Sequence, residues 1–339
     1  MLTKTQTDKP NRLPAYALAA WLFLLLWATT GCAAPAPALA PALAPASAPA
    51  PTPQAQTVSD RAWLWLHSQE LAQGGFGDSR GEISPNSTST VLAVLATLPP
   101  SDADQIRRDA ALTAMQPGAV AWLAGRDSGL LAKAALGVIG AGGDPRQFAG
   151  LNLVAELSAV YDAQPGLYHP ESFYRHLLAV QALAAAGEAV PDGALAAIGR
   201  LQQADGSWSW RIDGAATSGD VDTTAQTLLA LAAAGVKADD SRVQAALAYL
   251  ARTQSTQGGW AMDADSVPNA DSTGLALHAF GRLGLTDSAY PAIRAAQAQA
   301  WLATLQQPDG SFHYSADLPG TVLLATLDAL PAFQWQFAE

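Results

Sequence analysis

The sequence predicts an all-α fold in which six helical hairpins close into a ring. Three observations lead to this prediction: Ala- and Leu-rich segments that end at Gly or Pro, a repeated Leu-x-x-Gln phrase followed by Gly-x-aromatic, and long connections that alternate with short ones. Gly206, Gly258 and Gly310 mark three copies of the phrase and lie 52 residues apart each time. A fixed period of this length is typical of repeat architectures.

The Ala- and Leu-rich segments are expected to be the inner helices of the ring. The stretches from Asp222 to Gly235, from Asp271 to Gly284 and from Tyr174 to Gly187 each span 13 residues. Ala and Leu favour helix, and a terminal Gly ends it. Because these segments are apolar nearly all round, burial on every side is expected. More amphipathic segments, such as 241–254, are expected to form the outer layer.

An outer and an inner helix alternate six times, which predicts an α6/α6 toroid. The pairs are expected at 59–98, 104–142, 149–187, 191–235, 240–284 and 289–331. An open solenoid is the alternative, but the polar capping ends that a solenoid needs are not evident. In a ring of parallel inner helices, the long outer-to-inner loops all fall at one rim, beside the N-terminal ends of the inner helices. That rim is the expected functional face.

The first 58 residues are expected to serve export. Residues 1–31 combine a basic start with the apolar run Ala15–Ala28, which has the length of a signal peptide. Cys32 follows Gly31, an arrangement that resembles a lipoprotein cleavage site, so lipidation of Cys32 is expected. Residues 32–58 read as an Ala/Pro-rich tether and 59–339 as the toroid domain. The expected location is extracytoplasmic, either lipid-anchored to the cell membrane or secreted.

Composition narrows the possible partners and cofactors. The chain has 29 Asp and Glu against 18 Lys and Arg and no basic stripe, so nucleic acid is not an expected partner. Its single cysteine excludes an intramolecular disulfide and any zinc site with more than one thiolate. No cofactor or metal is expected, since no histidine pair has metal-site or triad spacing. The expected partner of a monomeric ring is a small molecule or a cell-surface protein, with membrane contact only through an N-terminal lipid.

The repeated phrases resemble those of a known superfamily. They read Gln202-Gly206-Trp208, Gln254-Gly258-Trp260 and Gln306-Gly310-Phe312. Over residues 59–331 the chain resembles a bacterial prenyltransferase/squalene-oxidase repeat protein. This resemblance implies an α6/α6 toroid related to terpenoid cyclases, protein prenyltransferases and the α-domain of the cobalamin carriers intrinsic factor and transcobalamin. One fold that carries several functions does not select among them.

The superfamily's activities can be compared with individual residues. Protein prenyl transfer resembles a zinc reaction with a cysteine ligand, and the complement-type thioester also needs a cysteine, whereas the expected ring has none. Cyclases of the squalene–hopene type carry Asp-x-Asp-Asp before Thr-Ala. Asp220 and Asp222 match the first two acids, with Asp222 at the proton donor's place, while Thr223 departs from the pattern. Those enzymes are also longer and have a second barrel.

Helix capping is the other interpretation of Asp222. This residue precedes an apolar helix, and Asn86 and Asp271 stand at the matching place in two other repeats. A capping carboxylate accepts backbone N–H bonds and lies at the positive helix end, so it stays ionised, which is the wrong state for a proton donor. The sequence therefore favours capping by Asp222 and leaves Asp220 without a role.

Aromatic and histidine side chains gather in the rim loops and are the expected ligand contacts, together with two acids. The full set is Asp222, Asp271, Tyr168, His169, Tyr174, Trp208, Trp210, Trp260, His313 and Tyr314. The leading hypothesis is a ring that binds a small molecule, such as a corrinoid or a polyprenoid, without catalysis. The alternatives are a terpenoid cyclase-like lyase that uses Asp220 and Asp222, and a cell-surface protein-interaction scaffold.

Overall fold

The computed structural model describes residues 56–337, apart from 79, 98–101 and 213–217. The predicted signal peptide, Cys32 and nearly all of the predicted tether lie outside the described residues. Contacts group residues 54–339 into one unit. Within its described part, regular structure consists of twelve α-helices and one 3-10 helix, besides isolated β-bridges. None of the helices in that part is both long enough and apolar enough to cross a membrane.

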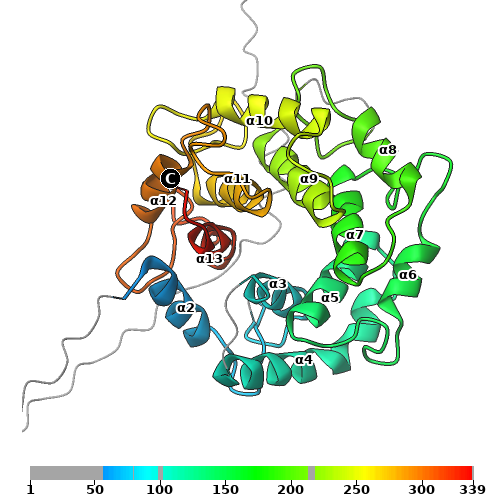
Figure 1. The fold of residues 1–339 in the computed structure, drawn as a ribbon. Coiled ribbons are helices and arrows are strands. Elements are labelled where there is room, and N and C mark those ends of the chain that lie inside the picture. Colours follow the sequence, from blue (N-terminus) through cyan, green and yellow to red (C-terminus); the bar gives the residue numbers. More distant parts are fainter. Residues whose placement is uncertain (1–55, 79, 98–101, 213–217, 338–339) are drawn as a thin grey trace, which may run out of the picture. The chain divides into compact units, whose positions relative to one another are not determined.

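Two concentric layers of helices form the ring (Figure 1). The inner helices are α3 (Pro85–Leu95), α5 (Ser128–Gly140), α7 (Phe173–Ala185), α9 (Val221–Ala233), α11 (Ala270–Arg282) and α13 (Val322–Ala329). The outer helices are α2 (Val58–Ser68), α4 (Asp102–Leu123), α6 (Leu153–Ala159), α8 (Asp192–Arg200), α10 (Ser241–Thr253) and α12 (Ala295–Ala303). Each inner helix packs against the next in chain order, from α3 to α13. The predicted all-α ring of six hairpins is confirmed.

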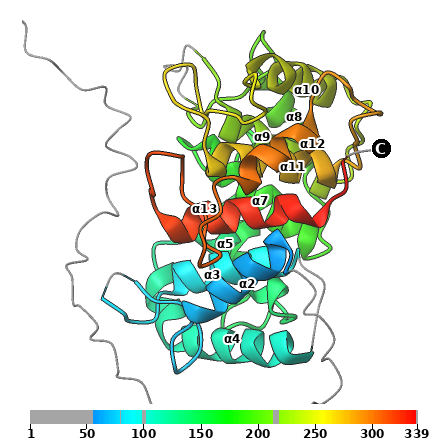
Figure 2. The ribbon, with the colours of Figure 1, turned by 90° about the vertical axis from the view of Figure 1, so that its left-hand side faces the viewer.

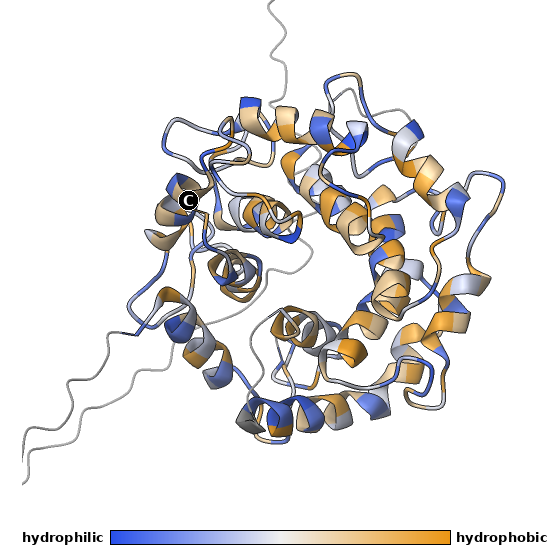
Figure 3. Ribbon diagram, in the orientation of Figure 1, coloured by the Kyte–Doolittle hydropathy of each residue, from blue (hydrophilic) through white to orange (hydrophobic). Residues whose placement is uncertain are grey.

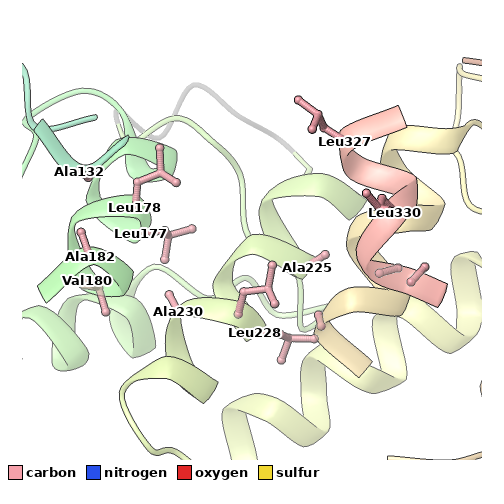
Figure 4. Close-up of a cluster of buried hydrophobic side chains, with 14 of the residues drawn as sticks. Ala132, Leu177, Leu178, Val180, Ala182, Ala225, Leu228, Ala230, Leu327 and Leu330 are labelled. Atoms are coloured by element: carbon pink, nitrogen blue, oxygen red, sulfur yellow. The ribbon is translucent and has the colours of Figure 1, made fainter. Parts of the chain in front are cut away.

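Buried apolar side chains fill the wall of the ring. Figure 3 shows where hydrophobic residues lie along the helices. Figure 4 shows part of this core, where Leu177 of α7, Leu228 of α9 and Leu327 of α13 are all buried. Small residues bring neighbouring inner helices into backbone contact. A Cβ on Gly140 would lie 2.1 Å from Leu92 O, so only glycine fits at this crossing of α3 and α5.

A recurring hydrogen bond joins each of four rim loops to the inner helix that follows it. The peptide N–H of Trp208 donates to Thr224 Oγ1 at 3.1 Å. Equivalent bonds join Phe76 to Thr88, Trp260 to Thr273 and Phe312 to Thr326. In the third hairpin a histidine replaces the threonine, because the N–H of Tyr168 donates to His176 Nδ1 at 3.3 Å. The Gly-x-aromatic phrase is therefore part of the scaffold.

The glutamine of the repeated phrase binds the next outer helix. Gln306 Nε2 donates to Gly310 O (3.0 Å) and to Val58 O (2.8 Å), which joins the last hairpin to the first. Gly310 has φ +99°, and a Cβ there would lie 2.2 Å from Arg61 O, so glycine is required on both counts. Gln202 makes the equivalent pair of bonds within the chain. The same interaction thus repeats along the ring and closes it.

The long loops between outer and inner helices lie at one end of the ring, as predicted, and occupy the left side of Figure 2. Each of three loops is tied to the inner helix of the preceding hairpin. The bonds run from Phe173 N to Trp210 O (2.8 Å), from Val221 N to Met262 O (2.9 Å) and from Ala270 N to Tyr314 O (2.7 Å). These loops therefore lie over the N-terminal ends of α7, α9 and α11.

Candidate ligand site at the N-terminal rim

Asp220, rather than Asp222, caps helix α9. Its Oδ1 accepts from Thr223 N at 2.7 Å, and its Oδ2 accepts from the Thr223 hydroxyl at 2.9 Å. The prediction that Asp222 is the cap is wrong, as is the view that Asp220 is not needed as one. The helix begins two residues earlier than the apolar pattern indicated, because Val221 is already helical and buried. Asp222 is thus released from capping.

The same shift of two residues occurs in two other inner helices. Asn269 Oδ1 accepts from Ser272 N at 2.8 Å and caps α11, while Ser84 caps α3. Asp271 and Asn86, predicted to be caps, therefore lie inside the first turn. The residues at this second helical position around the ring are Asn86, Gly129, Tyr174, Asp222, Asp271 and Leu323. All except the buried glycine are half-buried.

Asp222 and Asp271 form a carboxyl pair on adjacent inner helices. Burial raises the pKa of Asp222 to about 7; the Ser272 hydroxyl opposes this rise, and the charge of Asp220 adds to it. Burial, followed by the charge of Asp222, raises the pKa of Asp271 to about 7. Because each ionised carboxylate disfavours the other, the pair retains a proton near neutral pH.

The pair is also incompletely bonded. Asp222 Oδ1 and Asp271 Oδ1 are shielded from solvent and have no hydrogen-bond partner among the described residues. The Ser272 hydroxyl lies near Asp222 but does not meet it at hydrogen-bonding distance and angle, so it too is unpartnered within that part of the chain. Buried polar atoms are normally paired. These oxygens can therefore accept hydrogen bonds from a bound molecule or donate through a retained proton.

Further groups converge on the pair from other elements. Burial, and then the charges of Asp271 and Asp222, raise the pKa of Asp328 on α13 well above its usual range, while Lys133 on α5 acts in the opposite direction. Burial raises the pKa of Tyr174 on α7, with Asp328 the next cause. Asp222, Asp271 and Asp328 are called the acid cluster below.

Sequence reasoning did not select Lys133, Asp328 or Met262. Lys133 and Asp328 were missed because the inner helices were expected to be buried on every side. A charged residue within an apolar helix is nevertheless a signal of an inward polar surface. Met262 lies 52 residues after Trp210 and 52 before Tyr314, so the repeat could have identified it. Its carbonyl lies over α9, beside Asp222.

Two of the predicted tryptophans lie in the wall rather than at the surface of the rim. Trp208 and Trp260 are fully buried. Their indole N–H groups donate to Ile198 O and Leu250 O, both at 2.8 Å. Trp210 is different, because 45% of its surface is exposed and the guanidinium of Arg211 lies 5.5 Å from its ring centre. Trp210 is therefore the tryptophan of this set that a ligand can reach.

The remaining predicted contacts occupy two places. Tyr168 is buried, with its ring 4.8 Å from that of Tyr161. His169 is half-buried, and its Nδ1 accepts from Ser172 N at 2.9 Å. Burial and the charge of Arg175 lower the pKa of His169. On the opposite side of the rim, the half-buried rings follow the Gly-x-aromatic phrase of the last hairpin at His313 and Tyr314.

Burial raises the pKa of Tyr314 to about 12, and the charges of Asp271 and Asp222 add to the shift. This phenol therefore remains a hydrogen-bond donor next to the acid cluster. Among the described residues, no three His, Cys, Asp or Glu side chains are arranged to hold a metal ion. The site thus presents neutral proton-bearing groups, which suit hydrogen bonding or general acid chemistry.

Comparison with known proteins gives the family and the fold. The family model described as the prenyltransferase alpha-alpha toroid domain matches residues 49–119, 147–267 and 223–320. A comparison with curated protein sequences found no match. The type II terpene cyclase MstE from Scytonema (apo) resembles this chain with a TM-score of 0.62 and 15% identity, over 82% of this chain and 96% of that one.

Haptocorrin in complex with Cbi resembles the chain with a TM-score of 0.50 and 16% identity, over 81% of this chain and 65% of that one. At these low identities, the structural matches show a common fold and leave the ligand open. The family model, by contrast, matches well over half of the sequence. The chain therefore belongs to the prenyltransferase alpha-alpha toroid family.

Proposed function

We propose that this toroid binds a small molecule at its N-terminal rim, with Asp222 and Asp271 as the main polar contacts. The observation that carries the proposal is the pair of shielded, unpartnered oxygens, Asp222 Oδ1 and Asp271 Oδ1, on adjacent inner helices. A ligand hydroxyl or amine supplies the missing partners. The expected gain in binding free energy is large, because a buried polar atom without a hydrogen bond costs about 1–3 kcal/mol.

The rim around these acids favours a ligand that also has an apolar part. Large apolar side chains are exposed there, at Trp210, Val267, Leu318 and Leu324. They belong to the loops and first turn that surround the acid cluster. Related toroids are described with ligands of this mixed kind, geranylgeranyl dihydroxybenzoate in MstE and Cbi in haptocorrin. A polyprenoid with a polar head, or a corrinoid, is therefore the ligand class to test.

Binding of geranylgeranyl dihydroxybenzoate and of a corrinoid tests the proposal. Isothermal titration of each with the wild-type chain is compared with Asp222→Asn/Asp271→Asn and with the exposed control Asp239→Asn. We expect about a 10-fold to 100-fold loss of affinity in the double variant, since hydrogen bonds to charged groups contribute about 1.5–3 kcal/mol, and no loss in the control. Equal affinities in all three proteins, or no bound small molecule in native mass spectra of protein from its source cells, would contradict it.

Proton donation by Asp222 is the second candidate, and a specific observation favours it. Asp220 accepts the first-turn bonds of α9, so Asp222 is not held ionised by capping. Its pKa of about 7 keeps a substantial fraction protonated at neutral pH. The length of the chain raises no objection, because the similar MstE chain is covered over 96% of its length. In such a lyase Asp222 gives its proton to a carbon–carbon double bond, and the final cation later loses a proton.

The two candidates differ in what Asp222→Asn changes. An amide keeps the shape of the carboxyl but donates no acidic proton. If Asp222 is a proton donor, turnover of a geranylgeranyl substrate is lost while affinity changes only a few-fold, as measured by gas chromatography–mass spectrometry beside titration. If the rim binds without catalysis, the wild-type protein gives no product. An unchanged product profile in the variant eliminates Asp222 as the proton donor.

We further propose that the ring is exported as a monomer and held at the cell membrane by a lipid on Cys32, without nucleic-acid partners. The sequence around Cys32 supports this proposal. Cys32→Ser is expected to abolish incorporation of labelled palmitate and to move the protein from the membrane fraction to the soluble fraction. Unchanged labelling or fractionation contradicts it. If no small molecule binds, a cell-surface protein recognised by the rim is the remaining role.

A further inference from the structure

Lys133 is the one charged residue in the inner helix α5. The flanking residues Ala132 and Ala134 are fully buried, whereas Lys133 is half-buried. Its Nζ donates to Asn86 Oδ1 of α3 at 3.3 Å. In the described part of the chain, no carboxylate lies within ion-pair distance of this amine. A lysine placed on an apolar helix beside a neutral amide has no evident structural purpose.

The charged groups around Lys133 come from each neighbouring element. Burial lowers the pKa of its ammonium; Asp328 of α13 raises it, Arg175 of α7 lowers it, and Asp127 at the start of α5 raises it. Arg175 is itself paired with Asp127, at 2.7 Å. Asp328 is the acid least able to compensate the amine, since burial and the other two acids of the cluster favour its neutral form.

We propose that Lys133 forms an imine with a ligand that carries an aldehyde or ketone group. The lone pair of unprotonated Nζ attacks the carbonyl carbon, and the carbonyl oxygen takes a proton from a neighbouring carboxylic acid. The carboxylate takes one proton back from nitrogen, which leaves a neutral carbinolamine. The same acid then protonates the hydroxyl, which leaves as water while the nitrogen lone pair forms the C=N bond; the second N–H proton returns to the carboxylate, and hydrolysis reverses the sequence. No oxidant or reductant takes part. A desolvated lysine is the usual nucleophile for this chemistry.

The acid cluster supplies the proton donors that imine formation needs. Lys133 bonds to Asn86, the second residue of α3, and Tyr174, Asp222 and Asp271 are the second residues of their own inner helices. Asp328 acts electrostatically on both Lys133 and Tyr174. The inference rests on the proposed small-molecule site, because the same rim admits the ligand. It adds a covalent bond and a chemical class, a carbonyl compound, to that proposal.

Reductive methylation of the full chain with formaldehyde and cyanoborohydride at pH 7 tests the amine itself. Lysine occurs only at positions 4, 9, 133 and 237, and Lys237 is exposed, so it serves as an internal reference. Peptide mass spectrometry is expected to show that Lys133 is methylated faster than Lys237 despite its lower exposure. Each unit by which a pKa falls gives about a 10-fold rise in free amine. Slower methylation of Lys133 than of Lys237 overturns the proposal.

A second arm tests the carbonyl ligand. Decanal, at a concentration below that of the protein, is added with cyanoborohydride to wild-type, Lys133→Arg and Lys237→Arg chains. The reduced adduct is expected at Lys133 in the wild-type and Lys237→Arg chains and to be absent in Lys133→Arg, whose melting temperature confirms folding. An adduct spread evenly over the lysines overturns the inference. Because titration of the Asp222→Asn/Asp271→Asn variant is independent of this result, failure of the imine is distinguishable from failure of the binding site.

Discussion

The two halves of the inner ring carry different polar side chains on equivalent helices. In the half built from α3, α5 and α7, the half-buried polar residues include Asn86, Lys133 and Tyr174. In the half built from α9, α11 and α13, they form the acid cluster. The scaffold is the same in both, because Thr88 and Thr224 bond their loops alike. Function is therefore expected at the positions where the hairpins differ, and stability at the positions where they agree.

This difference also explains why the acids tolerate one another. At Asp222 and Asp271, burial and a neighbouring carboxylate outweigh the opposing Ser272 hydroxyl, so the pKa of each acid rises. Lys133 lies across from them and opposes only the shift of Asp328. The ring thus has acids with raised pKa values in one half and one poorly compensated amine in the other.

The largest expected effect comes from separating α11 and α13. In Gly274→Ala the new Cβ would lie 2.2 Å from Asp328 O, so the helices of the acid half must move apart. We expect a loss of about 1–3 kcal/mol in the free energy of unfolding, measured by urea denaturation. Gly140→Ala, in the other half, is expected to cost a similar amount, because its Cβ would lie 2.1 Å from Leu92 O.

Gly125→Ala is the matched control, since no atom lies within 4 Å of the added Cβ. Of these three variants, only Gly274→Ala displaces Asp328, so only this variant is expected to reduce ligand affinity. Equal losses of affinity in Gly274→Ala and Gly140→Ala would mean that the acids do not form the ligand contact.

The second prediction concerns pH. The folded-state pKa of Asp222 and of Asp271 is about 7, against 3.8 ordinarily, so between these values the folded chain holds protons that the unfolded chain has released. Their contribution to stability is therefore present at low pH and is lost as pH rises through 7. Asp222→Asn removes one buried charge and is expected to stabilise the chain by about 1–2 kcal/mol at pH 8, after allowance for solvent screening, and little at pH 5.

Urea denaturation at both pH values checks this prediction, with the exposed Asp239→Asn as the control. A gain that is the same at pH 5 and pH 8 would show that the carboxyl is ionised throughout.

Below about pH 6, His176 and His278 change the stability of the fold in the opposite direction. Burial lowers the pKa of His176 and of His278 to about 4, so folding loses stability as they are forced to take up protons.

The ring and the rim of long loops could be predicted from the sequence because their signals repeat. The phrase that contains Gly206 recurs at Gly258 and Gly310, and each copy reports the same packing of loop against helix. The start of the inner helices could not be fixed in this way. Asp220 and Asp222 both suit a cap, and only the backbone shows which one accepts the N–H of Thr223.

The contacts between residues across the ring could not be predicted for a related reason. Their roles depend on which side chains meet across the ring, and Lys133 and Asp328 are 195 positions apart in the sequence. Apolar periodicity describes how a helix contacts its neighbours in the wall. It carries no information about the face turned to the ring interior, where a helix such as α5 has room for one charge.

The third prediction separates the cap, Asp220, from Asp222, the acid proposed to contact a ligand. Asp220→Ala removes two hydrogen bonds from the first turn of α9 and is expected to cost about 1–2 kcal/mol. Ser172→Ala, in the other half, is expected to cost less, because its bond from Arg175 N is long, at 3.4 Å. Asp222→Ala is expected to leave stability unchanged or raised at pH 8. Thermal unfolding measures all three, and a larger loss in Asp222→Ala than in Asp220→Ala would reverse the assignment.

The smallest effect is expected where the two halves meet through the outer layer. Gln306→Leu removes the bond to Val58 O and the bond that Gln306 Oε1 accepts from the Arg61 guanidinium, both of which join the last hairpin to the first. A net loss of about 1 kcal/mol is expected, since water can reach part of this half-buried site. Gln202→Leu removes the equivalent bond to Arg242 O inside the chain and is the control.

Chain connectivity holds α10 in place beside Gln202, whereas only non-covalent contacts hold α2 against the last hairpin. Hydrogen exchange is therefore expected to accelerate along α2 in Gln306→Leu and to change little along α10 in Gln202→Leu. Equal acceleration in the two helices would mean that the ring is closed by apolar packing alone.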